Sequence, residues 1–376
     1  AQWWGDEVNE LGEAFYALSP SGQLLARKGI LELVNWQAAN GVLYSPVPAG
    51  NRVSELPLQM LASVGWYGFH TQYWFSGDSS FVAEVYPKVE RYLFRSGLWR
   101  FKDNGLLNVR HGDWNWGDWG NDIDTEVLTN CWYYLALKSQ KEFARILGKE
   151  KDAETIGALM KRIADAFDAQ YWTGSAYRDP NYKKQTDDRA QAMAIVSGLA
   201  TADKYPALFE TLKKEYHASP YMEKYVLEAL FKMGHADFAI ERMKSRYAKM
   251  LGYDYTTLFE GWGIGSEGFG GGTINHAWSG GPLTIMSQKL SGIEPTAPGF
   301  KAFEVKPQMG SLKAASASLE THYGMIRVTL SRKSAKSHVA TLSIEVPEGT
   351  TATVTASNGK PKTMSAGKYS LKVKVD

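Results

Sequence analysis

The chain has almost none of the features that mark disulfide-rich, metal-thiolate or membrane-spanning proteins. Cys131 is the only cysteine among 376 residues, which excludes an intrachain disulfide and a thiolate metal site. No apolar run reaches the ~20 residues of a membrane-spanning helix, and no segment has the pattern of a signal peptide. We therefore predict no membrane partner. The compartment stays open between periplasmic or secreted and cytoplasmic.

Motifs for metals, cofactors and nucleotides are also missing. The seven histidines have neither HxxxH nor HExxH spacing, and the acids near Asp118 lack the spacing of an EF-hand loop. The segment 263–268 satisfies GxGxxG, but it follows no predicted strand and lies in no βαβ unit. There is no GxSxG elbow and no Walker A motif. We therefore predict no metal and no cofactor.

Charge and tryptophan are unevenly distributed along the chain. The net charge is only +2, which argues against nucleic acid as the main partner. Residues 297–376 carry 12 Lys/Arg and 5 Asp/Glu, and the rest of the chain carries 30 and 35. All 13 Trp precede residue 279. This distribution predicts two domains, of which the acidic, Trp-rich one carries carboxylate chemistry and stacks sugar rings. Lysines on the solvent faces of a small β domain suffice to explain the positive net charge of residues 297–376.

Helical periodicity dominates residues 1–293. Leu128, Trp132 and Leu135 recur at helical spacing, as do Ile163 and Phe167. The pattern predicts about eleven helices, joined in pairs by short turns, with longer loops between some pairs. Such an alternation suits a toroid of helical hairpins whose long loops gather at one end. The expected helix starts lie near Asp6, Gly22, Glu55, Ser80, Asp124, Lys151, Thr186, Tyr205, Pro220, Ala236 and Asn275.

The period changes to two after a predicted linker at 293–300. Alternating apolar residues at 326–330, 342–346, 352–356 and 369–375 predict strands, and Asn358-Gly359 predicts a turn. Residues 297–376 are therefore expected to form a small antiparallel β-sandwich. Its low aromatic content favours a packing role over sugar binding.

Three segments combine Trp with carboxylates just before a predicted helix. They are Gln2–Glu7, Arg110–Glu126 and the stretch from Glu260 to His276. In a sugar-processing site, a carboxylate activates water, aromatic faces hold the ring and a neutral His bonds a hydroxyl. Structural alternatives stay open for individual residues. Glu260 could be solvated on a surface loop, Asp124 could be a helix N-cap, and His276 could be a hydrogen-bonded core residue.

In this order and spacing, the three segments resemble the α-L-rhamnosidases of glycoside hydrolase family 78. TTLFEGWG at 256–263, INHAWSGG at 274–281 and LSGIEPTAPGFKAFEVKP at 290–307 carry the resemblance. The segment His217–His235 also looks like the family's penultimate helical hairpin. The resemblance covers nearly the whole chain. It implies an (α/α)6 barrel over residues 1–293, a β domain over residues 297–376 and inversion at the anomeric carbon.

The resemblance also implies roles for individual residues. Glu260 matches the general base, and His276 matches a His that contacts the bound sugar. Trp3 and Asp6 match sugar-contacting positions. Asp118 and Trp119, in GDWG, match a loop whose Trp lines the sugar pocket.

Four departures from the family pattern affect these expectations. The family's general acid falls two residues upstream of Ala1, outside this sequence, and the expected helices number one fewer than the barrel's twelve. The chain also starts without Met, so we expect a later part of a longer protein, with the barrel's first helix missing. SELPLQ at 54–59 replaces a Trp-containing segment of the family's sugar pocket, and the stretch from Glu260 to His276 is shorter than usual.

The leading hypothesis is a bacterial inverting exo-α-L-rhamnosidase that removes terminal rhamnose, with Glu260 as general base and a carbohydrate as the partner. A catalytically crippled carbohydrate binder, or a relative acting on another deoxy-sugar, follows from the absent acid. Asp6 or Glu7 could substitute for that acid, although both match sugar contacts better. A polysaccharide lyase is a third reading, which the acid-rich segments disfavour. The aglycone, linkage and oligomeric state are not predicted.

Overall fold

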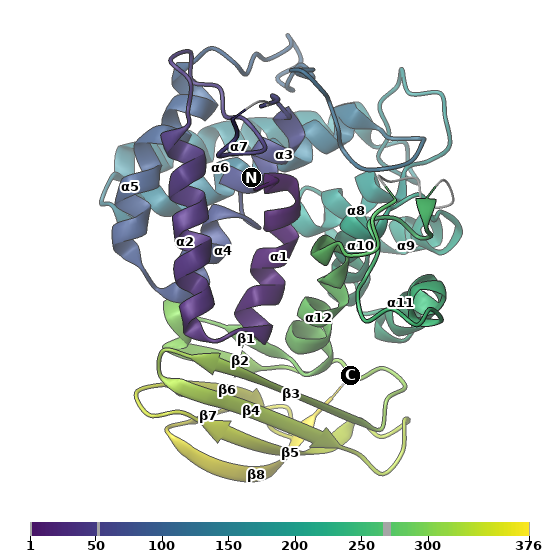
Figure 1. Ribbon diagram of the computed structural model, residues 1–376. Helices are drawn as coiled ribbons and strands as arrows, with labels where there is room; N and C mark the ends of the chain where they lie inside the picture. Colours follow the sequence, from purple (N-terminus) through teal and green to yellow (C-terminus); the bar gives the residue numbers. More distant parts are fainter. Residues whose placement is uncertain (1, 51–52, 266–271, 376) are drawn as a thin grey trace.

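The computed structural model describes residues 2–50, 53–265 and 272–375 of the chain. A helical body is followed by a region of two β-sheets, which lies below the helices in Figure 1. None of the described helices is long and apolar enough to cross a membrane. The α-helices are α1 (Trp4–Ala17), α2 (Pro20–Asn35), α3 (Pro57–Val64), α4 (Phe69–Ser76), α5 (Ser79–Glu90), α6 (Thr125–Ile146), α7 (Glu150–Tyr171), α8 (Asp188–Ser197), α9 (Tyr205–Lys214), α10 (Pro220–Lys232), α11 (Ala236–Leu251) and α12 (Gly281–Ile285).

The hairpin of α6 and α7 illustrates how the sequence sets these helices. Asp124 caps α6, because its Oδ1 accepts a hydrogen bond from the backbone N–H of Val127 at 3.2 Å. The N-cap reading of Asp124 is therefore confirmed. The predicted apolar stripes of both helices are buried. Gly148, with φ of 69°, makes the short turn between them.

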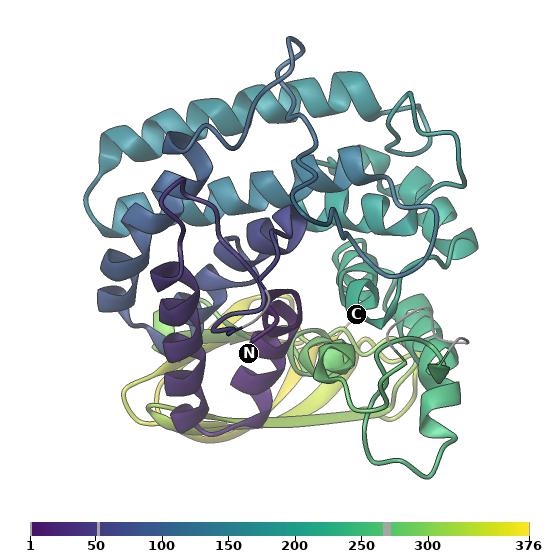
Figure 2. The ribbon, with the colours of Figure 1, turned by 45° about the horizontal axis from the view of Figure 1, so that its top comes forward.

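Six of the helices form a closed cycle of contacts. α1 packs on α3, α3 on α6, α6 on α8, α8 on α10, α10 on α12, and α12 returns to α1. Other helices cover this inner set: α2 lies against α1 and α4, α5 against α4 and α6, α7 against α6, α9 against α8, and α11 against α10. Figure 2 shows these helices arranged around the middle of the helical body.

The described part of the chain has one α-helix more than the sequence predicts, because the apolar run 57–76 reads as a single helix. It breaks into α3 and α4 around Gly68, where an added Cβ would lie 1.9 Å from the carbonyl oxygen of Ser63. The helix expected near Asn275 starts as a 3₁₀ turn at Ala277–Gly280 and becomes α-helical at Gly281.

The C-terminal region is mostly antiparallel. One sheet has the order β1-β2-β6-β7 and the other β3-β4-β5-β8, and their inner faces enclose a common core. The paired strands of the described sheets run antiparallel, except for β2 and β6, which run parallel. The strands are β1 (Ile293–Pro295), β2 (Ala302–Val305), β3 (Ala314–Thr321), β4 (Gly324–Ser331), β5 (Val339–Val346), β6 (Thr351–Thr355), β7 (Pro361–Met364) and β8 (Gly367–Lys374).

The predicted linker 293–300 is wrong in its first half. Ile293–Pro295 forms β1, because its backbone pairs with β2 and Ile293 is fully buried. The predicted turn at Asn358-Gly359 is confirmed between β6 and β7, where Gly359 has φ of 80°.

Helix α1 connects the two regions. Phe15 stacks on Phe75 at a centroid distance of 5.0 Å, and both belong to the core that the sheets enclose. The hydroxyl of Tyr16 donates to the carbonyl of Ile293 at 2.7 Å. The C-terminal end of α1 is thus anchored on the β-sheets, and its N-terminal end, which carries Trp3 and Asp6, is held in a fixed place.

Candidate active site

The loop that carries Glu260 is closed by backbone hydrogen bonds. The N–H of Glu260 donates to the carbonyl of Thr273 at 3.0 Å, and the N–H of His276 donates to the carbonyl of Leu258 at 2.9 Å. The indole N–H of Trp278 donates to the carbonyl of Glu260 at 3.0 Å. These bonds align the Glu260 side chain with those of Thr273 and His276.

The Glu260 carboxylate is held by donors on both oxygens. Oε1 accepts from the indole N–H of Trp119 at 3.0 Å, and Oε2 accepts from the hydroxyl of Thr273 at 2.8 Å. Nδ1 of His276 lies 3.7 Å from Oε2. The residue is only 6% exposed, which disagrees with the alternative of a solvated surface acid. Because Trp119 and Thr273 each donate to a different oxygen, they hold Glu260 as a hydrogen-bond-accepting carboxylate in a single orientation.

His276 links Glu260 to Asp6 across the pocket. Its Nε2–H donates to Asp6 Oδ1 at 2.6 Å, and its Nδ1 lies 2.8 Å from the hydroxyl oxygen of Thr273. A Thr273 hydroxyl that donates its single proton to Glu260 can only accept from His276, which favours a proton on Nδ1. Burial lowers the pKa of His276, but the hydrogen bond and charge of Asp6 outweigh it, so that the pKa is raised. The two hydrogen bonds and the raised pKa favour the protonated form of His276 over the neutral form expected from the sequence.

Tryptophan rings form most of the pocket around this network. The rings of Trp116 and Trp278 stack with centroids 5.6 Å apart. The cavity has a volume of about 340 Å³, within the range of small-molecule sites. Its lining residues are Trp3, Asp6, Gln59, Trp114, Trp116, Trp119, Glu260, His276 and Trp278.

Asp118 lies outside this lining. Its side chain is fully buried, and its Oδ2 accepts from Arg189 Nη1 at 3.2 Å and from the backbone N–H of Ser219 at 2.8 Å. The Ser219 hydroxyl donates to the other oxygen. Burial raises the pKa of Asp118 to about 6, against the lowering effect of Arg189.

Arg189 holds the loop that presents Trp119. Beyond its ion pairs with Asp118 and Asp187, its guanidinium donates to the backbone carbonyls of Trp119 at 3.2 Å, Asn121 at 2.7 Å and Asp122 at 3.0 Å. A single buried cation thus ties several backbone carbonyls of the loop to α8. No residue pattern in the sequence pointed to this role.

The structure brings together five of the six residues singled out from the sequence. Trp3, Asp6, Trp119, Glu260 and His276 line one pocket. They come from the N-terminal end of α1, the loop before α6 and the segment before α12, so the loops before inner helices meet at one end of the body.

Sequence reasoning missed Gln59, Thr273 and Trp278. Thr273 and Trp278 stand beside His276, so that closer attention to its neighbours would have found them. Gln59 ends the SELPLQ segment, which the family resemblance matches to a part of the sugar pocket, so that its place was indicated although its residue type was not. It lies at the start of α3, buried against Gly5, and its Oε1 has no hydrogen-bond partner.

Metal ligands are not grouped in the part of the chain that the structure describes, which holds no cluster of three or more His, Cys, Asp or Glu suited to an ion. The chemistry that the pocket offers is the oriented carboxylate of Glu260, the hydrogen-bonded pair of Asp6 and His276, and aromatic faces.

The structure thus defines a protein of paired helices that carries a Trp-walled pocket with an oriented carboxylate at one end. The chain belongs to the bacterial α-L-rhamnosidase six-hairpin glycosidase family. Residues 2–290 match the model of the bacterial alpha-L-rhamnosidase 6 hairpin glycosidase domain. Residues 292–370 match that of the bacterial alpha-L-rhamnosidase C-terminal domain.

Individual relatives agree with this assignment. An alpha-L-rhamnosidase of Formosa agariphila is 24% identical over 303 residues, which cover 75% of this chain and 32% of that protein. The fold matches the structure of alpha-L-rhamnosidase from Dictyoglumus thermophilum with a TM-score of 0.84, at 19% identity, over 99% of this chain and 46% of the other. It also matches Streptomyces avermitilis alpha-L-rhamnosidase complexed with L-rhamnose, with a TM-score of 0.81, at 22% identity, over 99% and 38%. The chain spans about a third of the length of the curated relatives it matches.

The raised pKa of His276 predicts a pH-dependent contribution to stability. A histidine whose pKa is higher in the folded state stabilises the folded protein, and this contribution is complete at pH values below the unfolded pKa of ~6.5. The contribution is lost as the pH rises through the pKa of the folded state. We expect His276→Asn to lower the free energy of unfolding by about 1–2 kcal/mol at pH 6, and by progressively less as the pH rises toward 9. Urea unfolding at several pH values measures this gap, with the exposed His322→Asn as control. A gap that stays constant or widens with pH would contradict the imidazolium assignment.

Proposed function

We propose that this chain is the sugar-binding and base-carrying part of an inverting exo-α-L-rhamnosidase, with Glu260 as general base. The observation that carries the proposal is the Glu260 carboxylate, oriented by Trp119 and Thr273 at the wall of a pocket made of Trp rings. For Glu260, this arrangement favours a catalytic carboxylate over a solvated surface acid. For His276, it favours a residue of the pocket over a hydrogen-bonded core residue.

The proposed scaffold is an (α/α)6 toroid. The closed cycle of α1, α3, α6, α8, α10 and α12, covered by further helices, supports this architecture, as does family membership. In such a toroid the N-terminal ends of the inner helices share one end. Loops from distant parts of the sequence can then converge on a single sugar.

In the proposed reaction, Glu260 takes a proton from a water molecule that attacks the anomeric carbon from one face. A general acid protonates the leaving oxygen on the other face, and inverting pairs stand ~6.5–9.5 Å apart to leave room for the water. Trp3 and Trp119 offer ring faces to the C–H groups of the sugar. Asp6 and His276, already bonded to each other, offer hydrogen bonds to its hydroxyls. The rhamnose complex of the Streptomyces relative supports the choice of sugar.

Asp118 enters this proposal as a positioning residue. Its carboxylate is enclosed by Arg189 and Ser219, so its contribution to sugar binding passes through the neighbouring Trp119. The sequence-based expectation that it contacts the sugar directly is therefore replaced by this indirect role.

The general acid is proposed to lie upstream of Ala1, as the family resemblance implies. Within the chain, Glu7 has the pKa of an acid for neutral conditions, raised to about 7 by burial and by the charges of Glu10 and Asp6. Glu7 does not line the pocket, however, and Asp6 is bonded to His276. A second candidate function is therefore sugar binding without turnover. It is favoured because Asp6 and Glu260 are the carboxylates among the described lining residues.

Two measurements on the 376-residue chain test the proposal. Quenching of Trp fluorescence by L-rhamnose measures binding, and release of p-nitrophenol from p-nitrophenyl α-L-rhamnoside measures turnover. We expect saturable binding, weakened at least ten-fold in Trp119→Ala, because the pocket loses both a ring wall and the donor to Glu260. β-L-rhamnose as the first product, seen by NMR, would establish inversion. Failure of L-rhamnose to bind, with the chain folded, would refute the sugar assignment.

If the chain binds rhamnose without turnover, the same assay on a polypeptide that includes the upstream segment separates the two functions. Turnover there would support the upstream acid. Binding without turnover by the longer polypeptide would support the non-catalytic alternative.

A further inference from the structure

The side-chain amide of Gln59 is buried at the wall of the Trp-lined pocket without a hydrogen-bond partner. Gln59 is 5% exposed and belongs to the pocket lining. Its Oε1 is buried and has no donor, and its amide nitrogen makes no hydrogen bond with a described residue. Buried polar groups in proteins are nearly always paired, so that an unpaired amide in a pocket wall requires an explanation.

The position of Gln59 in α3 offers a local partner that the side chain does not use. α3 begins at Pro57, so that Gln59 is the third residue of the helix. A Gln in this place can turn back and bond the backbone N–H of the residue before the helix, as in a capping box. Oε1 of Gln59 does not accept from Leu56 in this way, because it has no donor. The amide is therefore presented to the pocket instead of capping its own helix.

Contacts with α1 hold this amide in place. Gly5 leaves the space that the amide fills, because a Cβ added there would lie 2.6 Å from the amide carbon and nitrogen of Gln59. The Ser63 hydroxyl lies 2.7 Å from the carbonyl oxygen of Gln59 and 3.2 Å from that of Trp4, and so joins the two helices. Gly5 directly precedes Asp6, so the amide stands on the part of the wall that also carries Asp6.

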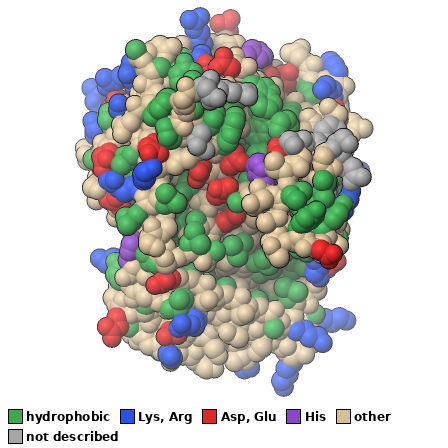
Figure 3. Space-filling view, in the orientation of Figure 1, with side chains coloured by type: hydrophobic (Ala, Val, Ile, Leu, Met, Phe, Trp, Pro, Cys, Tyr) green, Lys and Arg blue, Asp and Glu red, His purple; other side chains and the backbone are tan. Residues whose placement is uncertain are grey.

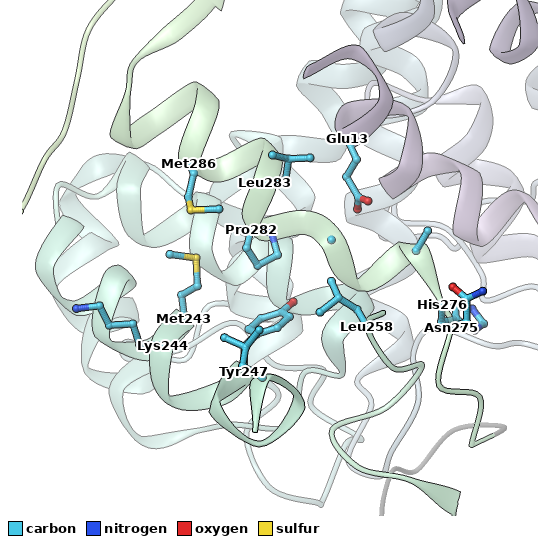
Figure 4. A pocket seen from close by; sticks show the side chains of 13 residues that line it. Glu13, Met243, Lys244, Tyr247, Leu258, Asn275, His276, Pro282, Leu283 and Met286 are labelled. Atoms are coloured by element: carbon cyan, nitrogen blue, oxygen red, sulfur yellow. The ribbon is translucent and has the colours of Figure 1, made fainter. Parts of the chain in front are cut away.

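The charged side chains of the lining already have partners within the protein. Asp6 and His276 are bonded to each other, and Glu260 accepts from Trp119 and Thr273. His276 also borders the neighbouring groove between α11, α12 and α1, whose lining it shares (Figure 4). Its second nitrogen contacts the Thr273 hydroxyl. These groups are engaged before a ligand arrives, whereas the amide of Gln59 is not.

The hydrogen-bonding capacity of an amide matches that of a sugar hydroxyl. Figure 3 shows acidic side chains gathered over α1 in the middle of this face, and ionised carboxylates only accept hydrogen bonds. The indole N–H of Trp116, which is also buried without a partner, only donates. An amide accepts through Oε1 and donates through Nε2. A hydroxyl likewise donates one hydrogen bond and accepts others.

We propose that Gln59 is a specificity-determining residue of this pocket, whose amide pairs with one hydroxyl of the bound sugar. The inference rests on the proposed function, because it takes a rhamnose-type sugar as the ligand. A sugar without this hydroxyl leaves the buried amide unpaired and is rejected. The Trp rings select the faces of the sugar, and Gln59 selects a hydroxyl on the edge that meets α3.

Monodeoxy sugars test this contact. Methyl α-L-rhamnopyranoside and its 2-, 3- and 4-deoxy derivatives are titrated against the 376-residue chain and its Gln59→Leu variant, with Trp fluorescence as the signal. We expect Gln59→Leu to bind the parent glycoside about ten-fold more weakly. One deoxy derivative should bind the variant within about three-fold of the parent glycoside, because its missing hydroxyl no longer strands a partner. The other two derivatives should keep the penalties that they show with the unchanged chain.

Protein stability distinguishes this role from a structural one. Leucine replaces an unpaired buried amide with an apolar group of similar size, so the free energy of unfolding should stay unchanged or rise. Gln72→Leu is the matched control. Gln72 is 1% exposed and its Oε1 also lacks a partner, but it lies in α4, outside the described pocket lining. We expect this variant to bind the parent glycoside within about two-fold of the unchanged chain.

Three results would overturn the proposal while leaving the sugar assignment intact. They are an unchanged affinity of Gln59→Leu for the parent glycoside, deoxy penalties that all persist in this variant, and an equal loss of affinity in Gln72→Leu. In each of them the unchanged chain still binds the rhamnoside. If the folded, unchanged chain binds none of the four glycosides, the sugar of the proposed function is refuted, and the hydroxyl contact of Gln59 is refuted with it.

Discussion

Replacing Arg189 with methionine is expected to lower the free energy of unfolding by about 3–5 kcal/mol. Arg189 is fully buried, and its guanidinium pairs with Asp118 and Asp187. Methionine fills a similar volume but leaves both carboxylates without their cation in a site closed to water. The stability cost therefore comes mainly from the stranded anions.

The same substitution should also damage the sugar pocket. Arg189 holds the backbone carbonyls of Trp119, Asn121 and Asp122, and Trp119 donates the hydrogen bond to Glu260. We expect Arg189→Met to weaken L-rhamnose binding at least ten-fold under conditions where the variant is folded. Urea unfolding and rhamnose titration of Trp fluorescence measure the two effects.

Arg242→Met is a matched control for this prediction. Arg242 is equally buried and pairs with Asp188 and Glu223, but its other bonds go to the carbonyls of Leu212 and Glu215, away from the Trp119 loop. We expect a similar loss of stability with rhamnose affinity changed less than three-fold. An equal loss of rhamnose affinity in both variants would show that the loss follows from reduced stability of the whole protein. It would then not follow from the hydrogen bonds of Arg189 to the Trp119 loop.

Residues that act through their immediate neighbours could be predicted from the sequence. The stripes of α6 and α7, the N-cap Asp124 and the alternation of β4 and β5 depend on spacing within one element. Trp119, Glu260 and His276 stand in segments whose composition is unusual for a loop. The local signal was therefore sufficient to identify them as site candidates.

Features that depend on distant contacts could not be predicted in this way. The pKa of His276 is raised by Asp6, which is 270 residues away in sequence. The burial of Asp118 requires Arg189 and Ser219, which arrive from α8 and from the residue before α10. Gln59 reaches the pocket only because Gly5 leaves room for its side chain. In each case the deciding partner is remote, and no pattern within one segment encodes it.

Two local misreadings have a different cause. The break between α3 and α4 is made by close backbone packing at Gly68, within an apolar run that suits a continuous helix. The segment 293–300 reads as a linker because of its prolines and short length, but its first three residues, Ile293–Pro295, form β1. Its strand character comes from pairing with β2 and from burial against the core shared with α1.

Glu260→Gln is expected to reduce kcat/KM for p-nitrophenyl α-L-rhamnoside by about 10²–10⁴-fold. The measurement uses the 376-residue chain if that chain turns the substrate over, and otherwise the polypeptide that includes the proposed upstream segment. Glutamine keeps the shape of the side chain: its single amide oxygen can accept from Trp119, and its NH2 can donate to the hydroxyl oxygen of Thr273. It cannot take a proton from water. Rhamnose affinity should therefore change only a few-fold, and the loss should fall on kcat.

Two further variants distinguish the role of Glu260 as a base from the contribution of the groups around it. Trp119→Phe keeps a ring in the pocket wall but removes the indole donor to Glu260, and we expect a loss of about ten-fold. Glu260→Ala opens space beside the anomeric carbon, so that added azide should restore turnover by attacking without a base and give the β-glycosyl azide. A Glu260→Gln variant that retains more than a tenth of the activity would show that another group activates the water. In that case Asp6, the other carboxylate of the described pocket lining, would be the next residue to replace.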